Sequence, residues 1–124
     1  MANEATIKCS LQILKNNLQY RNYPTDFQGD ITGENGPTPG AFNVTTAGVD
    51  VDLSELTTPG YCVIRNLDST NFFEIGLFIS STFHELAEVL PGESYVIRLS
   101  RNVSNLRLKA DTAALKASVE CFEA

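Results

Sequence analysis

The sequence has 124 residues, of which 43% are hydrophobic and 19% are charged, and its formal net charge is −6. This composition is that of a globular protein, and the length predicts one domain over residues 1–124. The acidic balance and the scattered Lys and Arg residues argue against a surface that binds nucleic acid. No apolar run approaches the roughly 20 residues of a membrane span, and the first residues lack signal-peptide features, so we expect folding in a cytoplasm and no membrane contact.

The first predicted strand extends from Thr6 to Leu14, where apolar and polar residues alternate. The pair Asn16 and Asn17 then predicts a turn. A weaker strand region follows from Leu18 to Ile31. Because Pro24 has no backbone N–H to donate, this region is expected either at a sheet edge or interrupted at the proline.

The segment Thr32 to Gly40, TGENGPTPG, contains three glycines and two prolines and is predicted to be a loop. Loops on a rigid scaffold often carry binding contacts, so this one is either a plain connector or an arm that reaches a partner. Residues Met1–Thr6 are a second candidate arm. Within the loop, the residues expected to contact another subunit or a partner protein are Glu34, Asn35, Pro37 and Pro39.

The rest of the chain consists of short runs in which apolar and polar residues alternate. This period of two is typical of half-buried strands, because successive side chains leave a strand on opposite faces. Thr82–Leu90 also has helical spacing, but it is short and lies between strands, so a strand is favoured. Eight to ten short strands joined by turns predict an all-β fold, either an antiparallel β-sandwich or a closed barrel. The runs lie at Ala41–Thr45, Val49–Leu53, Tyr61–Leu67, Phe72–Ile79, Thr82–Leu90, Tyr95–Leu99, Leu106–Ala110 and Leu115–Cys121.

Reactive side chains are sparse, and no catalytic motif is present. His84 is the only histidine, which excludes sites built from several histidines, and no serine lies in a nucleophile elbow. Asp50 and Asp52 form a D-x-D pair without the further ligands of a calcium loop. Most acidic residues fall at turns or on outward strand faces, where a solvated charge is the default. We therefore expect no enzymatic activity, no metal and no cofactor.

Two further side-chain sets are candidates for contacts. The three cysteines, Cys9, Cys62 and Cys121, lie in apolar runs and are expected to be buried free thiols, although a Cys9–Cys121 bridge stays open. Phe72 and Phe78 share the second face of their strand. Either another subunit or a loop of the same chain must cover them, and they are the predicted subunit contact.

From Pro59 to Ala124 the chain resembles small virion proteins of tailed bacteriophages. The resemblance rests on PGYCVIRNLDSTNFFEIG, LPGESYVIRLSRN and LRLKADTAALKASVECFE, and the first half adds YPTDFQGDITG and GPTPGAF. The pattern consists of a strand ending in N-L-D-x-T-N, a strand ending in E-I-G, a P-G-E turn and a closing K-A-D-T-A hairpin. These are strand and turn signatures rather than catalytic motifs.

The resemblance implies a non-enzymatic head decoration or cement protein that binds the major capsid protein on the capsid exterior. It further implies a homotrimer with a β-sandwich or jelly-roll body. A tail, fibre or baseplate component is the alternative within the virion. Outside it, the alternative is a carbohydrate-binding module, for which Tyr20, Tyr23 and Tyr61 are the available aromatic platform.

Overall fold

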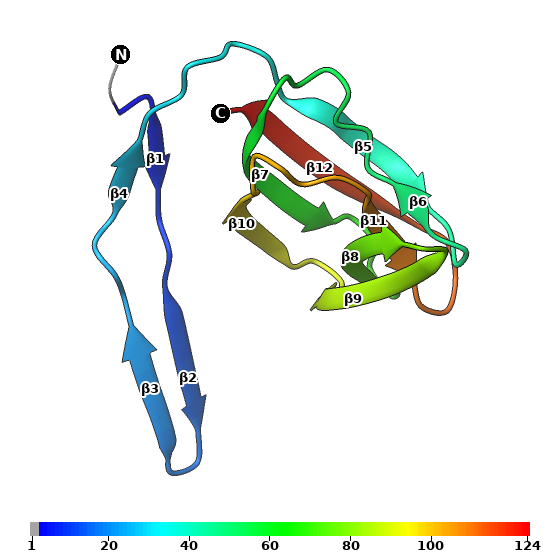
Figure 1. The fold of residues 1–124 in the computed structure, drawn as a ribbon. Helices are drawn as coiled ribbons and strands as arrows, with labels where there is room; N and C mark the ends of the chain where they lie inside the picture. Colours follow the sequence, from blue (N-terminus) through cyan, green and yellow to red (C-terminus); the bar gives the residue numbers. More distant parts are fainter. Residues whose placement is uncertain (1–2) are drawn as a thin grey trace. The chain divides into compact units, whose positions relative to one another are not determined.

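The computed structural model describes residues 3–124 and divides the chain into two compact units, Met1–Thr32 and Gly33–Ala124 (Figure 1). We call the described part of the first unit the arm and the second unit the body. The sequence predicted one domain over all 124 residues, whereas the structure confines the sandwich to the body. Within residues 3–124, no helix is long and apolar enough to cross a membrane.

The arm is a two-stranded antiparallel ladder that is interrupted midway. Strand β1 (Ala5–Ile7) pairs with β4 (Phe27–Gly29), and β2 (Leu11–Lys15) pairs with β3 (Leu18–Asn22) across the predicted Asn16-Asn17 turn. Asn16 adopts a positive φ of 53°, which asparagine tolerates well in a tight hairpin turn. The predicted strand from Thr6 to Leu14 is therefore two strands.

The interruption lies on both sides of the ladder. Of the two alternatives for Pro24, a sheet edge or an interruption, the structure shows an interruption, since that residue lies between β3 and β4. On the opposite side the gap falls at residues 8–10, where Lys8 Nζ forms an ion pair of 2.7 Å with Asp26 Oδ2. The two halves of the ladder are thus separate sheets of two strands each.

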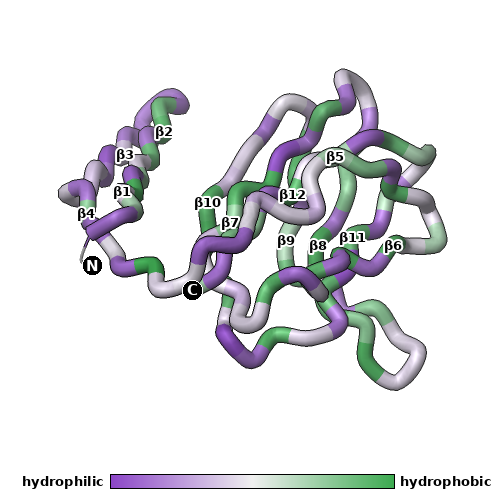
Figure 2. Tube along the Cα trace, turned by 90° about the horizontal axis from the view of Figure 1, so that it is seen from above, coloured by the Kyte–Doolittle hydropathy of each residue, from purple (hydrophilic) through white to green (hydrophobic). Residues whose placement is uncertain are grey.

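The body contains two four-stranded sheets, with the orders β10-β7-β12-β5 and β6-β11-β8-β9. Figure 2 shows the sheets as two layers, with β9 and β10 on one side and β5 and β6 on the other. Strands pair in a nested way: β5 with β12, β6 with β11, β7 with β10, and β8 with β9. The bounds are β5 Thr38–Val44, β6 Val49–Asp50, β7 Pro59–Asn66, β8 Phe73–Ile79, β9 Thr82–Val89, β10 Ser94–Arg98, β11 Leu106–Ala110 and β12 Leu115–Glu123.

The core lies between these two sheets. Its largest fully buried side chains include Phe73 of β8, Leu108 of β11 and Val119 of β12. Strands β11 and β12 show the predicted alternation, since every second residue is buried. The prediction of an all-β antiparallel sandwich is confirmed, and strand is the correct assignment for Thr82–Val89. The described chain has twelve strands, more than the eight to ten predicted, because each of the two strand regions predicted in the arm is divided into two strands.

The predicted loop Thr32–Gly40 is only partly a loop. Thr38, Pro39 and Gly40 belong to β5 and pair with Cys121, Glu120 and Val119 of β12. A proline is tolerated there because β5 is an edge strand, so the missing N–H costs no ladder bond on the outer side. The loop prediction therefore holds for the residues before Thr38 and is wrong for Thr38, Pro39 and Gly40.

The motif N-L-D-x-T-N is a turn that satisfies its own hydrogen bonds. The buried Asn66 amide donates to the carbonyl oxygens of Asn71 and Val89, both at 2.9 Å. Asp68 Oδ2 accepts from the backbone N–H groups of Thr70 at 2.9 Å and Asn71 at 2.6 Å. These backbone donors, with Asn71 the shorter, hold the pKa of Asp68 below its ordinary value of 3.8.

The P-G-E turn between β9 and β10 is built in the same manner. Glu93 Oε1 accepts from Leu90 N–H at 2.9 Å and from the Tyr95 hydroxyl at 2.8 Å. Gly92 supplies the positive φ of 78° that the turn requires. The motifs that carry the resemblance thus fix the geometry of connections in the body.

Candidate interaction surfaces

The loop that precedes β5 is attached to the end of β12. Glu123 accepts from the Asn35 side-chain amide at 3.2 Å and from Thr57 N–H at 2.8 Å, and its own N–H donates to the Asn35 carbonyl at 3.0 Å. The hydrogen bonds from Thr57 N–H and from the Asn35 side chain lower the pKa of the Glu123 carboxyl below its ordinary value of 4.5. The bond from Thr57 has the larger effect. The loop is therefore part of the body surface, and it does not extend away as an arm.

The four predicted contact residues of this loop lie together at one edge of the body. Glu34, Asn35, Pro37 and Pro39 are all exposed. Asn35 is held by Glu123, and Pro39 lies in the edge strand β5. These four residues form an accessible rim, and the prediction that they contact another protein stays a prediction.

The predicted pair Phe72 and Phe78 is half-buried. The guanidinium carbon of Arg107 lies 3.4 Å from the centre of the Phe78 ring, and Arg107 Nε forms an ion pair of 2.8 Å with Asp50. A side chain of the same chain thus covers part of Phe78 by a cation–π contact. Cover was expected from another subunit or from a loop of the same chain. For Phe78, part of the cover comes from within the chain, through Arg107.

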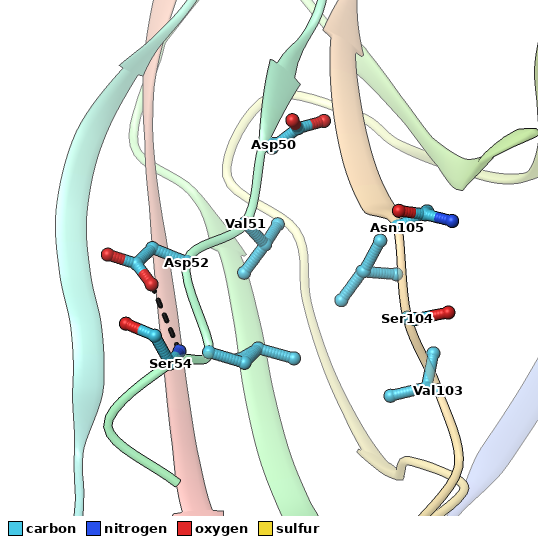
Figure 3. A pocket seen from close by; sticks show the side chains of 9 residues that line it. Asp50, Val51, Asp52, Ser54, Val103, Ser104 and Asn105 are labelled. Carbon is cyan, nitrogen blue, oxygen red and sulfur yellow. Dashed lines mark hydrogen bonds between the residues drawn. The ribbon is translucent and has the colours of Figure 1, made fainter. Parts of the chain in front are cut away.

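A shallow cleft of about 410 Å³ lies between the segments Asp50–Ser54 and Val103–Leu106. Figure 3 shows its lining, with Asp52 turned toward Ser54 N–H, which it contacts at 3.0 Å. The Ser54 side chain and backbone lower the pKa of Asp52 from 3.8. Asp50 is already paired with Arg107, and among residues 3–124 no three His, Cys, Asp or Glu side chains are grouped to hold a metal. Both carboxylates that line the cleft thus already have a partner within the chain, and part of the remaining lining is apolar.

The side of the sandwich formed by β9 and β10 is open. All five residues of β10 are exposed, and so are the five consecutive residues His84–Glu88 of β9. Both strands are edge strands, so their outer N–H and C=O groups have no neighbouring strand in the body. We call this surface the open edge and define it by Glu85, Leu86, Ala87, Glu88, Leu90, Tyr95, Val96 and Ile97.

The open edge exposes side chains that belong to the core face. Tyr95 pairs with Ile64 and Ile97 pairs with Cys62, and directly opposed residues share one face of a sheet. Ile64 and Cys62 are buried, yet Tyr95 is 48% exposed and Ile97 is 41% exposed. The core layer therefore reaches the surface on this side of the sandwich.

A bulge in β9 adds to the exposure of this surface. The pairing with β8 shifts between Ile75 and Gly76, so Leu86 has no partner in the register and is 79% exposed. A Cβ on Gly76 would collide with the backbone carbonyl of His84, so glycine is required where the bulged strand passes. The glycine of the E-I-G motif is explained by this close approach.

The arm carries a second unburied apolar surface. In the β2–β3 hairpin, Leu11, Ile13, Leu18 and Tyr20 share one face by their register, and their exposed fractions are 55%, 38%, 57% and 44%. The opposite face is mainly polar, with Gln12, Gln19 and Arg21 beside Leu14, which is also exposed. Sequence reasoning recognised the alternation in β2 but assumed that the apolar face would be buried.

The aromatic platform considered for glycan binding is divided between the two units. Tyr20 and Tyr23 belong to the arm, where the Tyr23 hydroxyl donates to Gln12 at 2.7 Å. Tyr61 belongs to β7 in the body, and Arg98 lies over its ring at 4.9 Å. Neither unit by itself therefore contains all three rings of the proposed platform.

The cysteines also differ between the units. Cys62 and Cys121 are buried and directly opposed on β7 and β12, whereas Cys9 is exposed and lies outside the strands. The hydrogen bond with Cys121, and then burial, raise the pKa of the Cys62 thiol. Burial was correctly predicted for two thiols and was wrong for Cys9, and all three are free in the structure.

No family model, no curated protein and no solved structure matches this chain.

Proposed function

We propose that this chain is a non-enzymatic structural protein of a tailed-bacteriophage virion. In this role it is a head decoration or cement protein that binds the major capsid protein and stabilises the outer capsid lattice. The motifs quoted from Pro59 to Ala124 support the virion class. The turns that these motifs build, around Asn66 and Glu93, support a rigid body suited to such a role.

The observation that carries the proposal is the combination of a cored body with an arm that buries almost nothing. Among the arm residues that the structure describes, only Ile7 is buried. A two-stranded hairpin alone is marginally stable in water, so its apolar face needs another protein surface. A chain built in this way gains stability as part of an assembly, which is how a lattice-binding protein functions.

A jelly-roll body and a homotrimer are part of the same proposal. The nested strand pairing supports a jelly-roll interpretation of the sandwich. A homotrimer would present three capsid-binding surfaces at once, and such multivalency raises apparent affinity without strong individual contacts. The exposed rim of Glu34, Asn35, Pro37 and Pro39 is the proposed capsid contact on each copy.

The N-terminal residues were the other predicted contact arm, Met1–Thr6. Its first two residues lie outside the described part of the chain, and Ala5 and Thr6 belong to β1. Because Thr6 pairs with Gln28, this segment takes part in the arm ladder. We propose that the segment supports capsid attachment through the arm.

The test is the copy number of the chain in purified particles, measured by quantitative mass spectrometry against the major capsid protein. A ratio near one to one, with fragile heads when the protein is absent, is the expected result. A few to a few tens of copies would instead assign the chain to the tail, fibre or baseplate. Absence from particles would contradict the virion proposal and bring the glycan-binding alternative forward.

A further inference from the structure

We propose that the β2–β3 hairpin of one chain docks on the open edge of a second copy of the same chain. This inference deepens the oligomer of the proposed function by naming the two surfaces that meet. The docking contact is tested on the purified protein, whereas the virion role is tested on particles. Either proposal can therefore fail while the other holds.

The hairpin requires a partner for energetic reasons. Its apolar face presents Leu11, Ile13, Leu18 and Tyr20, each at least 38% exposed. All ten residues of β2 and β3 are exposed, so the hairpin has no layer against which this face is buried within the arm. Removing leucine and isoleucine side chains from water is the main favourable term in protein association, so docking this face would stabilise the hairpin.

The open edge requires cover for the same reason. Tyr95 and Ile97 lie on the core face of β10, and Leu86 projects from the bulge of β9. The outer backbone groups of β10 are available for a further strand, which is the standard route of β-augmentation. Both β10 and each strand of the hairpin are five residues long, so the lengths match.

The charges of the two surfaces are complementary. The hairpin from Leu11 to Asn22 contains Lys15 and Arg21 and no acidic residue. Strand β9 contributes the exposed Glu85 and Glu88 to the open edge. The arm as a whole is neutral, with Lys8, Lys15 and Arg21 balanced by Glu4, Asp26 and Asp30, so the net charge of −6 belongs to the body. Lys15 pairs with Leu18 on the apolar face of the hairpin, whereas Arg21 pairs with Gln12 on the other face. The opposite net charges of the hairpin and the body favour this pairing over a contact between like surfaces.

A second copy is the partner that carries both surfaces in equal number. Each chain has one β2–β3 hairpin and one open edge. When the hairpin of one copy docks on the open edge of a second, the hairpin of the second copy is still free to dock on a third. Such a head-to-tail contact is heterologous, and it satisfies every hairpin and every edge once a ring closes. A foreign partner would cover the hairpin and leave the open edge bare.

The experiment uses two full-length variants, Ile13→Asp in the hairpin and Ile97→Asp in the open edge. The wild-type chain is expected to sediment as an oligomer, and each variant alone as a single chain. When the two variants are mixed, the intact hairpin of the Ile97 variant meets the intact edge of the Ile13 variant. The mixture is therefore expected to form a one-to-one dimer, detected by analytical ultracentrifugation.

Controls separate docking from folding. Ile79→Asp changes an isoleucine that is 47% exposed outside both surfaces, and it is expected to keep the wild-type oligomer. Circular dichroism of each variant checks that the body is folded, and Leu86→Ser replaces Ile97→Asp if the latter unfolds. A wild-type protein that is a single chain at all concentrations would overturn the proposal. Folded variants that stay monomeric when mixed would do the same, and arm-dependent binding to a particle protein would then identify a foreign occupant.

Discussion

The arm and the body are made of the same kind of sequence and have opposite packing. Both consist of antiparallel strands with alternating apolar and polar residues. In the body this alternation buries a cluster that includes Phe73, Leu108 and Val119, while Ile7 is the single buried residue in the described part of the arm. Alternation therefore predicts that a strand forms, but it does not predict that the apolar face finds a second layer.

The reason for the difference is the number of layers. The body has two four-stranded sheets whose apolar faces cover each other, and core-face side chains are exposed on the side of β9 and β10. The arm has at most two strands at any point along its length, so neither of its faces is covered by a second layer within the arm. Among the described residues, the hairpin face and the open edge are thus two apolar surfaces without cover inside their own unit.

The largest expected difference between the units is the reactivity of their thiols. Cys9 in the arm is exposed and should react with a maleimide within the mixing time of a native sample. Cys62 and Cys121 are buried, so a reagent in solution does not reach their thiols while the body is folded. These two should react at least ~100-fold more slowly, because labelling requires opening of the body.

Mass spectrometry of intact protein over a labelling time course measures this difference. One modification is expected early, and three are expected after denaturation, which matches the three cysteines of the chain. A Cys9→Ser variant is the control, and its native form should take up no early label. Rapid labelling at Cys62 or Cys121 in the native protein would contradict the closed packing between β7 and β12.

The second test compares two phenylalanines. Phe73→Ala removes a side chain with 0% exposure from the core and should destabilise the body by about 3–5 kcal/mol. Phe27→Ala removes a side chain in the arm that is 48% exposed and should change the unfolding of the body by about 0.5 kcal/mol or less. Urea denaturation followed by circular dichroism gives both values. Equal losses would mean that the arm and the body unfold as one cooperative unit.

The sequence predicted the fold of the body well because local rules decide it. Strands β11 and β12 follow their alternation closely, and the turns at Asn66 and Leu90 are fixed by side chains within a few residues. The same reasoning assigned Thr82–Val89 correctly as a strand. Here the tertiary structure agrees with what each segment prefers by itself, which is the condition for a successful prediction.

The remaining errors concern features that depend on distant residues. Thr38–Gly40 joins a strand because β12 pairs with it at the sheet edge, and no local rule reveals that partner. Cys9 lies in an apolar run but has no second layer above it. The open edge of Leu86 and Ile97 arises from a bulge and from the stacking of two edge strands, so no residue pattern indicated it. A candidate contact surface is visible only once the layers are known.

The smallest expected effect concerns pH and the turn at Asp68. Backbone N–H groups of Asn71 and Thr70 donate hydrogen bonds to this carboxylate and lower its pKa in the folded body. The ionised form of Asp68 therefore stabilises the folded state relative to the unfolded chain. The stabilisation is present above the unfolded pKa and is lost as the pH falls through the lower folded value. Thermal melts between neutral pH and pH values below 3.8 should show Asp68→Asn losing less stability on acidification than the wild type does.

The matched control for this experiment is Asp111→Asn, which changes an exposed aspartate that accepts a hydrogen bond from the neighbouring Thr112 hydroxyl at 2.9 Å. It should follow the wild-type pH profile. If both variants flatten the profile equally, general charge repulsion in the acidic body explains the pH dependence. If only Asp68→Asn flattens the profile, the turn after β7 is a specific source of acid sensitivity. This sensitivity is then a property of the body, since the arm has no turn of this kind among its described residues.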